Sequence, residues 1–189
     1  MQRITPKLPC VVYLHGNASS RVEAFQFAEQ LMINNITLFC FDFAGSGRSE
    51  GEYVSLGYFE KDDVNVVVEY LRKSNTVSTI GLWGRSMGAV TALLHADRDP
   101  SIACLIVDSP FMSLRKLGEE LYVKHSPIPK IFMGIAMRLI KGSVKSRAHF
   151  NLDDLAPIKH VNKSFIPALF IVAKGDDFID PHHGKELFE

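Results

Sequence analysis

A serine stands between two glycines at the point where an apolar run gives way to a helical pattern: Gly84-Arg85-Ser86-Met87-Gly88. Residues 79–83 before it predict a buried strand, and residues 89–96 after it predict an apolar helix. A sharp strand-to-helix turn strains the backbone of its central residue, and flanking side chains would clash, so glycines are needed. The flanking elements favour an exposed nucleophilic serine over an ordinary glycine turn.

Short apolar runs alternate with helical patterns along most of the chain. The predicted strands are residues 10–14, 36–43, 79–83, 102–107 and 166–172. Residues 59–73 and 89–96 predict helices, and Ser20 with Glu23 suggests a capping box that opens another. Strands that are apolar on both faces and alternate with helices predict a mostly parallel sheet, covered on both sides. Residues 111–155 break the alternation and predict helices inserted as a cap.

The composition excludes several classes of function. The 189 residues carry 21 Lys and Arg against 21 Asp and Glu, so the chain lacks the basic charge expected of a nucleic-acid-binding protein. The three cysteines, Cys10, Cys40 and Cys104, lie in or beside apolar runs and predict buried thiols in a reducing compartment. No apolar run is long enough to span a bilayer, and no signal segment opens the chain, so the expected location is the cytoplasm.

The loop after the first predicted strand contains His15-Gly16-Asn17. Acyl transfer needs two backbone N–H groups directed at the carbonyl oxygen as it becomes anionic. The residue after the nucleophile, Met87, supplies one in such sites, and a loop after an earlier strand supplies the other. We therefore expect the amides of Asn17 and Met87 to form an oxyanion hole. His15 is expected to support this loop rather than act as a base.

Two further segments place acids or glycines after predicted strands. The last predicted strand runs into a turn that carries Asp176 and Asp177, and either acid could orient a catalytic histidine. The alternative is a turn with two solvated carboxylates. The glycines of residues 42–49 lack the Gly-Lys-Ser/Thr and Gly-x-Gly-x-x-Gly patterns, so a nucleotide site is not expected.

Together these segments resemble the α/β-hydrolase superfamily, and within it the small serine hydrolases that are serine aminopeptidase-like or acyl-protein thioesterase-like. The matching residues are His15-Gly16-Asn17, Asp42 with Gly45, Gly47 and Ser49, Gly84-Arg85-Ser86-Met87-Gly88, Asp108-Ser109-Pro110-Phe111 and the Asp176 turn. The resemblance implies one domain, with a core at residues 8–110 and 156–189 and a helical cap at 111–155. It implies that Ser86 is the nucleophile, that Asn17 and Met87 form the oxyanion hole, and that Asp176 is the acid. Asp177 is the fallback, and Asp108 a more distant one.

The histidine base does not fit this chain in the usual order of nucleophile, acid and base. In the family the base follows one more helix and one more strand, for which the residues after Asp176 leave too little room. His182 and His183 fall where that helix opens and are expected to point away from Ser86. We therefore expect a chain truncated at both ends, with its base beyond Glu189 and nearly inactive as it stands.

The predicted cap suggests a substrate class. Residues 128–145 interleave apolar side chains with Lys130, Arg138, Lys141 and Lys145. We favour a cap whose apolar residues line an acyl pocket, which predicts esters or thioesters of acyl or lipid-like substrates; the alternative is a segment that lies on a membrane surface. Two other functions stay open, namely an aminopeptidase and a non-catalytic binding module. The aminopeptidase would need an acidic anchor from Glu119, Glu120, Asp153 and Asp154. Neither a cofactor nor a metal is implied.

Overall fold

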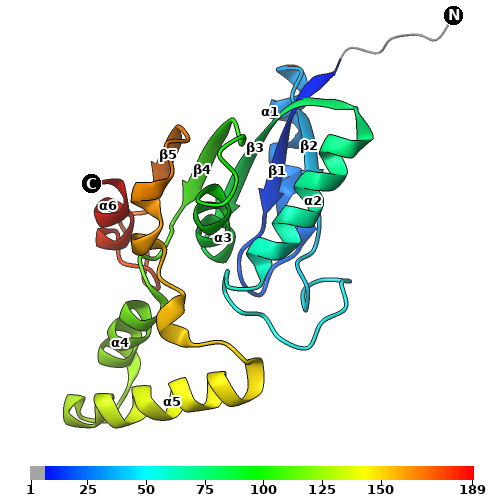
Figure 1. Cartoon of the computed structure of the whole chain (residues 1–189). Helices are drawn as coiled ribbons and strands as arrows, with labels where there is room; N and C mark the ends of the chain where they lie inside the picture. The colour runs from blue at the N-terminus through cyan, green and yellow to red at the C-terminus, as the bar shows by residue number, and fades with distance from the viewer. Residues whose placement is uncertain (1–6) are drawn as a thin grey trace, which may run out of the picture.

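The computed structural model describes residues 7–189, which fold around one five-stranded sheet (Figure 1). The elements in chain order are β1 (Leu8–Leu14), η1 (Arg21–Phe27), α1 (Ala28–Ile33), β2 (Thr37–Cys40), α2 (Glu60–Ser74), β3 (Val77–Arg85), α3 (Met87–Ala96), β4 (Cys104–Asp108), α4 (Leu114–His125), η2 (Lys130–Phe132), α5 (Met133–Ala148), η3 (Leu152–Asp154), η4 (Pro157–Lys159), η5 (Val161–Lys163), β5 (Ala168–Ile171) and α6 (His182–Phe188). Here η marks a 3-10 helix.

All four strand pairings are parallel, in the order β2-β1-β3-β4-β5. The chain first moves outward from β1 to β2 and then crosses back past β1 to β3. Because such crossovers are right-handed, this reversal puts α1 on one face of the sheet and α2 and α3 on the other. Figure 1 shows α2 and α3 together on one side, where they pack against each other. The predicted parallel sheet, covered by helices on both sides, is confirmed.

The point of reversal lies between β1 and β3, and open parallel sheets bind ligands beyond the carboxyl ends of the strands there. Leu14 is paired with Gly84, and Arg85 is paired with Asp108. This register brings the loop after β1, the turn after β3 and the end of β4 to one edge of the sheet. Residues far apart in sequence therefore meet where the motifs predicted a site.

The central strands carry the core, and the outer strands differ from what the sequence predicts. Val12, Leu82 and Val107 are almost completely buried, one on each of β1, β3 and β4. In contrast, β2 and β5 have four residues each and lie at the edges of the sheet among residues 7–189, so neither is buried on both faces. The prediction of three buried thiols also needs correction, because only Cys10 is buried whereas Cys104 is exposed.

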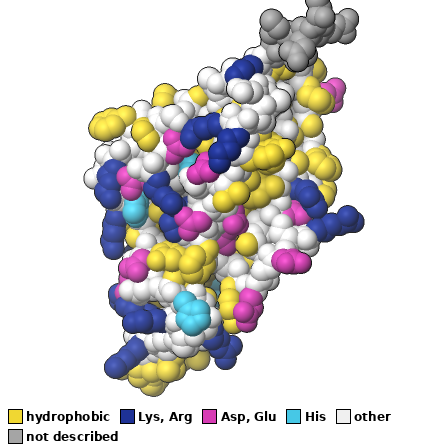
Figure 2. Space-filling model, turned by 45° about the vertical axis from the view of Figure 1, so that its right-hand side comes forward, with side chains coloured by type: hydrophobic (Ala, Val, Ile, Leu, Met, Phe, Trp, Pro, Cys, Tyr) yellow, Lys and Arg dark blue, Asp and Glu magenta, His cyan; other side chains and the backbone are white. Residues whose placement is uncertain are grey.

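The helices α4 and α5 lie below the sheet in the view of Figure 1, and they are in contact with each other. The predicted acyl-pocket lining is wrong for most of the apolar residues of this segment. Ile131, Ile135 and Leu139 are exposed, whereas Met137 is buried. Figure 2 shows yellow apolar side chains among dark-blue cations at the lower end of the molecule, where α5 lies. No helix among residues 7–189 has the length and apolar character needed to cross a membrane.

Candidate active site

Ser86 occupies the turn between β3 and α3 in a strained conformation. Its φ is 52° and its ψ is −113°, outside the regions that residues with a Cβ prefer. Two hydrogen bonds hold this geometry: the Ser86 amide donates to the Asp108 carbonyl at 2.8 Å, and the Ser86 carbonyl accepts from the Val90 amide at 3.0 Å. The side chain is half-buried and stands at the N-terminus of α3. The predicted strand, turn and helix are therefore all present around this serine.

The two flanking glycines are required by close backbone approach. A Cβ on Gly84 would overlap the backbone of Gly88, and a Cβ on Gly88 would overlap the carbonyl of Leu14 on β1. The helix therefore starts directly against the sheet, with no room for a side chain between them. This packing leaves the partial positive charge of the helix N-terminus beside the Ser86 hydroxyl.

The buried side chain of His15 holds the loop that follows β1. This imidazole is completely buried; its Nε2 accepts from the Phe43 amide at 3.1 Å, and its Nδ1 lies 2.8 Å from the Gly16 carbonyl. Nε2 therefore carries the lone pair and Nδ1 the proton. Both ring nitrogens are occupied, so His15 supports the loop and is not available as a base. The loop then turns at Asn17 and at Ala18, which has a φ of 54°.

The two predicted oxyanion donors lie on neighbouring segments of this edge. Met87 is the first residue of α3, and Asn17 is three residues beyond Leu14, the last residue of β1, which is paired with Gly84 of β3. Among residues 7–189, neither the Asn17 amide nor the Met87 amide donates a hydrogen bond outside the regular elements. Two N–H groups without acceptors at the same edge of the sheet as Ser86 suit the stabilisation of a developing oxyanion.

An ion pair that the sequence does not reveal joins the two loops. Glu23 accepts from the Arg85 guanidinium, with the Arg85 Nη2 at 3.0 Å, and also from the Tyr13 hydroxyl at 2.8 Å and the Gly16 amide at 3.3 Å. The predicted capping box is therefore wrong: the Ser20 side chain makes no cap bond, and η1 is a 3-10 helix. Glu23 faces the site instead, because four donors there compensate its buried carboxylate.

This ion pair predicts a specific dependence of stability on pH. Burial acts to raise the pKa of Glu23, but hydrogen bonds from Arg85, Ser19 and Tyr13 outweigh burial and lower the pKa to about 2. The folded-state pKa lies below the ordinary value, so the stabilisation is present above about pH 4.5 and is lost as the pH falls towards 2. Glu23→Gln is expected to lower the melting temperature at pH 7, and this deficit is expected to shrink in acid.

Thermal unfolding followed by circular dichroism between pH 2.5 and 7 checks this expectation at about half-unit steps. The matched control is Glu29→Gln, because Glu29 is exposed and lies on the following helix. A melting-temperature deficit of Glu23→Gln that stays constant across this pH range would contradict the assignment of this stabilisation to the Glu23–Arg85 ion pair.

The three candidate acids differ in how the structure holds them. Asp176 Oδ1 accepts from the amides of Phe178 at 2.8 Å and Ile179 at 2.9 Å, which orients the carboxylate. The Asp177 side chain is 96% exposed and is paired with Lys124. Asp108, at the end of β4, accepts from its neighbour Ser109 at 3.1 Å. Asp176 follows β5, has a carboxylate oriented by two backbone amides, and forms no ion pair within residues 7–189. Neither Asp177 nor Asp108 meets all three conditions.

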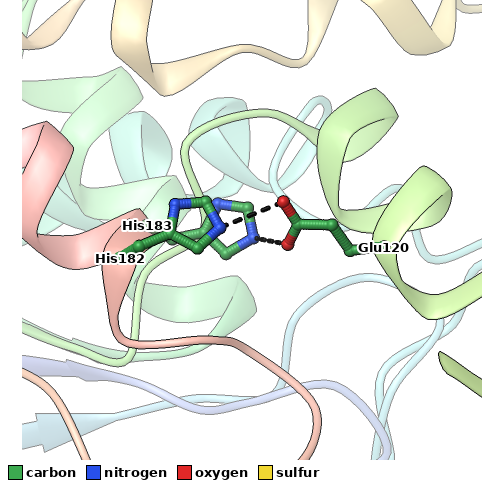
Figure 3. A group of neighbouring side chains, drawn as sticks. All are labelled: Glu120, His182 and His183. Atoms are coloured by element: carbon green, nitrogen blue, oxygen red, sulfur yellow. Dashed lines mark hydrogen bonds and ion pairs between the residues drawn. The ribbon is translucent and has the colours of Figure 1, made fainter. Parts of the chain in front are cut away.

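His182 and His183 open α6, as predicted, and both are bound to Glu120 of α4 (Figure 3). One Glu120 oxygen lies 3.0 Å from His182 Nε2 and the other lies 2.9 Å from His183 Nε2. His182 Nδ1 lies 2.9 Å from Glu186. No hydrogen bond links either ring to Ser86 or Asp176 among residues 7–189. The two histidines therefore join α6 to α4 and do not form the base of this site.

The same three side chains could be considered as metal ligands. The Met112 amide, however, points at His183 Nδ1 from 3.4 Å, so this nitrogen is the acceptor and Nε2 carries the proton. A metal on Nε2 would need the proton on Nδ1, where it would face another N–H group. Burial also lowers the pKa of His183, which keeps the ring neutral. The arrangement suits a link between α6 and α4, in which Glu120 is hydrogen-bonded to His182 and lies 2.9 Å from His183 Nε2, better than a metal centre.

Two clefts lie beside the helices of residues 111–155. One of about 180 Å³ is lined mainly by charged and methionine side chains of α4 and α5, with Leu152 and Asp153. The other, of about 260 Å³, lies between residues 53–56 and the C-terminal half of α5, and its apolar walls include Val54, Val144 and Phe150. The second cleft is the better match for an apolar ligand group.

Known proteins are similar to this chain in sequence. YqkD of Bacillus subtilis, itself uncharacterized, is 29% identical over 182 residues, covering 95% of this chain and 59% of YqkD. The lysophosphatidylserine lipase ABHD12 of Rattus norvegicus is 27% identical over 189 residues, covering 95% of this chain and 44% of that protein. The chain thus spans about half the length of the curated relatives it matches.

Solved structures show the same fold. The Pyrococcus furiosus esterase Pf2001 superposes with a TM-score of 0.72 and 24% identity, covering 96% of this chain and 68% of the esterase. Est1E of Butyrivibrio proteoclasticus, solved with ferulic acid, superposes with a TM-score of 0.74 and 19% identity, covering 99% of this chain and 78% of Est1E. The sequence profile of the family described as serine aminopeptidase, S33, matches residues 5–157. The chain therefore belongs to this family of serine hydrolases, within the α/β-hydrolase superfamily.

Proposed function

We propose that this chain carries the nucleophile, the oxyanion hole and the acid of a serine ester hydrolase. The observation that carries the proposal is the conformation of Ser86, which is held at φ 52° between β3 and α3. Strain of this kind persists only where the surrounding structure enforces it, and the packing of Gly84 and Gly88 does so here. The Ser86 turn lies at the strand-order reversal, and the amides of Met87 and Asn17 at this edge of the sheet support the proposal.

The chemistry follows from these positions. The Ser86 oxygen attacks the ester carbonyl carbon while its proton passes to a histidine base, which Asp176 would orient. The carbonyl oxygen becomes anionic and accepts from the amides of Asn17 and Met87. Collapse of this intermediate breaks the bond to the alcohol, which leaves with the proton. Water then attacks the acyl-enzyme by the same route, releasing the carboxylic acid and restoring Ser86.

A fluorophosphonate probe tests the proposal, because it reacts only with an activated serine and does not depend on the natural substrate. The protein at the full length that its gene encodes is incubated with the probe, digested and mapped by mass spectrometry. Labelling is expected at Ser86 and not at Ser109, which also has a positive φ, of 51°, at the end of the adjacent strand. A correctly folded protein that takes up no label at Ser86 would instead be a non-catalytic binding module.

For the substrate we propose esters of apolar acyl chains, with thioesters as a second class. The apolar cleft at Val54, Val144 and Phe150 supports this choice, and one relative is named a lysophosphatidylserine lipase. We expect kcat/KM to be higher for p-nitrophenyl octanoate than for the acetate, and Val144→Asp to reduce this preference. Val66→Asp, at an exposed position on α2, is the control. Equal rates with short and long chains in the wild-type protein would contradict the acyl pocket.

The aminopeptidase alternative receives less support from the structure. It needs a free carboxylate for the substrate amine, and three of the four acids considered for this role are already paired. Glu119 binds Arg115, Glu120 binds the two histidines of α6, and Asp153 binds Lys141. Asp154 is exposed at the end of η3. An ester hydrolase needs no such anchor.

A further inference from the structure

The face formed by η2 and α5 presents a row of large apolar side chains to solvent. Ile131, Ile135 and Leu139 recur every four residues and are 83%, 60% and 69% exposed. Residues at this spacing lie one above another on a helix. Phe132, beside them, is also exposed, so the row is a continuous apolar patch rather than scattered single residues.

The charges around this row all have one sign. Residues 126–149 contain five Lys and Arg and no Asp or Glu. Lys141 is paired with Asp153, but Lys130, Arg138, Lys145 and Arg147 have no ion pair within the part of the chain that the structure describes. The molecule as a whole has a net charge of zero. Positive charge is therefore concentrated at the helix that exposes the apolar row.

This combination distinguishes between possible occupants of the face. Two copies of the chain packed through it about a two-fold axis would bring like charges together, with no acid on either face to compensate them. An anionic lipid surface satisfies both features at once. Its acyl region accepts the isoleucine and leucine side chains, and its headgroups attract long cationic side chains that extend towards the interface.

We propose that the η2–α5 face, defined by Ile131, Phe132, Ile135 and Leu139 with the cations Arg138 and Lys145, docks onto membranes that contain anionic lipid. The helix would lie in the plane of the interface rather than cross the bilayer. The proposal goes beyond ester hydrolysis and does not depend on Ser86 being a nucleophile. Of these six side chains, only Arg138 lines one of the two clefts beside the helices of residues 111–155. The proposal assigns the six side chains to a binding surface.

Vesicle co-sedimentation tests the proposal with the whole protein. Binding is expected to vesicles of phosphatidylcholine mixed with phosphatidylserine, to weaken with added salt, and to be much weaker on phosphatidylcholine alone. Ile135→Ser with Leu139→Ser is expected to weaken binding by at least about tenfold. Val66→Ser with Tyr70→Ser, on the exposed face of α2, is the matched apolar control and is expected to bind like wild type.

A second pair of variants separates charge from apolar contact. The double variant Arg138→Glu with Lys145→Glu is expected to lose the preference for phosphatidylserine. The control, Lys7→Glu with Lys73→Glu, makes the same charge change outside α5 and is expected to keep this preference. Circular dichroism checks that each variant is folded. Ser86→Ala is expected to bind vesicles normally, which keeps this proposal distinguishable from the proposed reaction.

Three outcomes would overturn the proposal. The first is the absence of wild-type binding to phosphatidylserine vesicles. The second is equal binding by the apolar double variant and its α2 control. The third is a wild-type protein that binds no vesicles and is a dimer by light scattering, and that the double substitution Ile135→Ser with Leu139→Ser converts to a monomer. This result would assign the face to a second copy of the chain.

Discussion

Replacing Ser86 by alanine is expected to lower kcat for ester hydrolysis by on the order of 10⁶-fold, the loss typical when the nucleophile of a triad is removed. The oxygen that attacks the carbonyl is then missing, whereas the amides of Asn17 and Met87 stay in place. Residual catalysis above the uncatalysed rate is therefore expected from the proposed oxyanion hole. The melting temperature is expected to change little, because no hydrogen bond of the Ser86 hydroxyl stabilises the fold among residues 7–189.

Kinetics with a p-nitrophenyl ester measure this effect in the protein at the full length that its gene encodes. Ser109→Ala is the matched control, because it removes a hydroxyl from another serine that has a positive φ and lies at the same edge of the sheet. It is expected to retain most of the activity. If Ser86→Ala kept more than about a tenth of the wild-type rate, the hydrolysis would not depend on this serine, and the active site would have to be sought elsewhere.

Replacing Gly88 by alanine is expected to destabilise the protein by more than about 3 kcal/mol, at the upper end of the overpacking range. The added Cβ would overlap the Leu14 carbonyl, which belongs to the central strand β1 and cannot move without disrupting its pairing with β3. The helix α3 would have to shift away from the sheet. Because the Ser86 carbonyl bonds to the Val90 amide of that helix, the turn at Ser86 would be distorted as well.

Urea denaturation measures this loss, and Gly142→Ala provides a matched control with the same chemical change. Nothing lies within 4 Å of a Cβ built on Gly142, in the interior of α5. Alanine is favoured over glycine in a helix, so this variant is expected to gain up to about 1 kcal/mol. Equal small effects of the two substitutions would show that α3 does not pack against β1 as closely as the structure indicates.

The agreement between sequence and structure is best where a motif dictates local backbone geometry. The two glycines around Ser86, the predicted strand before them and the predicted helix after them are all present, because close packing at that turn tolerates few other residues. The helix predicted at residues 59–73 forms as Glu60–Ser74, with acids in its first turn and cations in its last. In both places short-range physics decides the conformation.

Other features depend on neighbours that lie far away in the chain. Glu23 has the spacing of a capping residue, yet it pairs with Arg85, which is 62 residues away in sequence. The apolar residues of α5 have the spacing of a buried face, yet Ile135 and Leu139 face solvent. A one-dimensional pattern records which side chains share a face of a helix, but not what that face packs against.

The sequence by itself determined the parallel α/β architecture, the strained serine turn and the loop that offers a second amide, because each follows from local sterics and periodicity. Only the tertiary structure decided which of these come together. The register of β1 with β3 and of β3 with β4 aligns the Asn17 loop, Ser86 and Asp108 along one edge. The same packing commits His15, His182 and His183 to support and linkage, because their ring nitrogens already face partners.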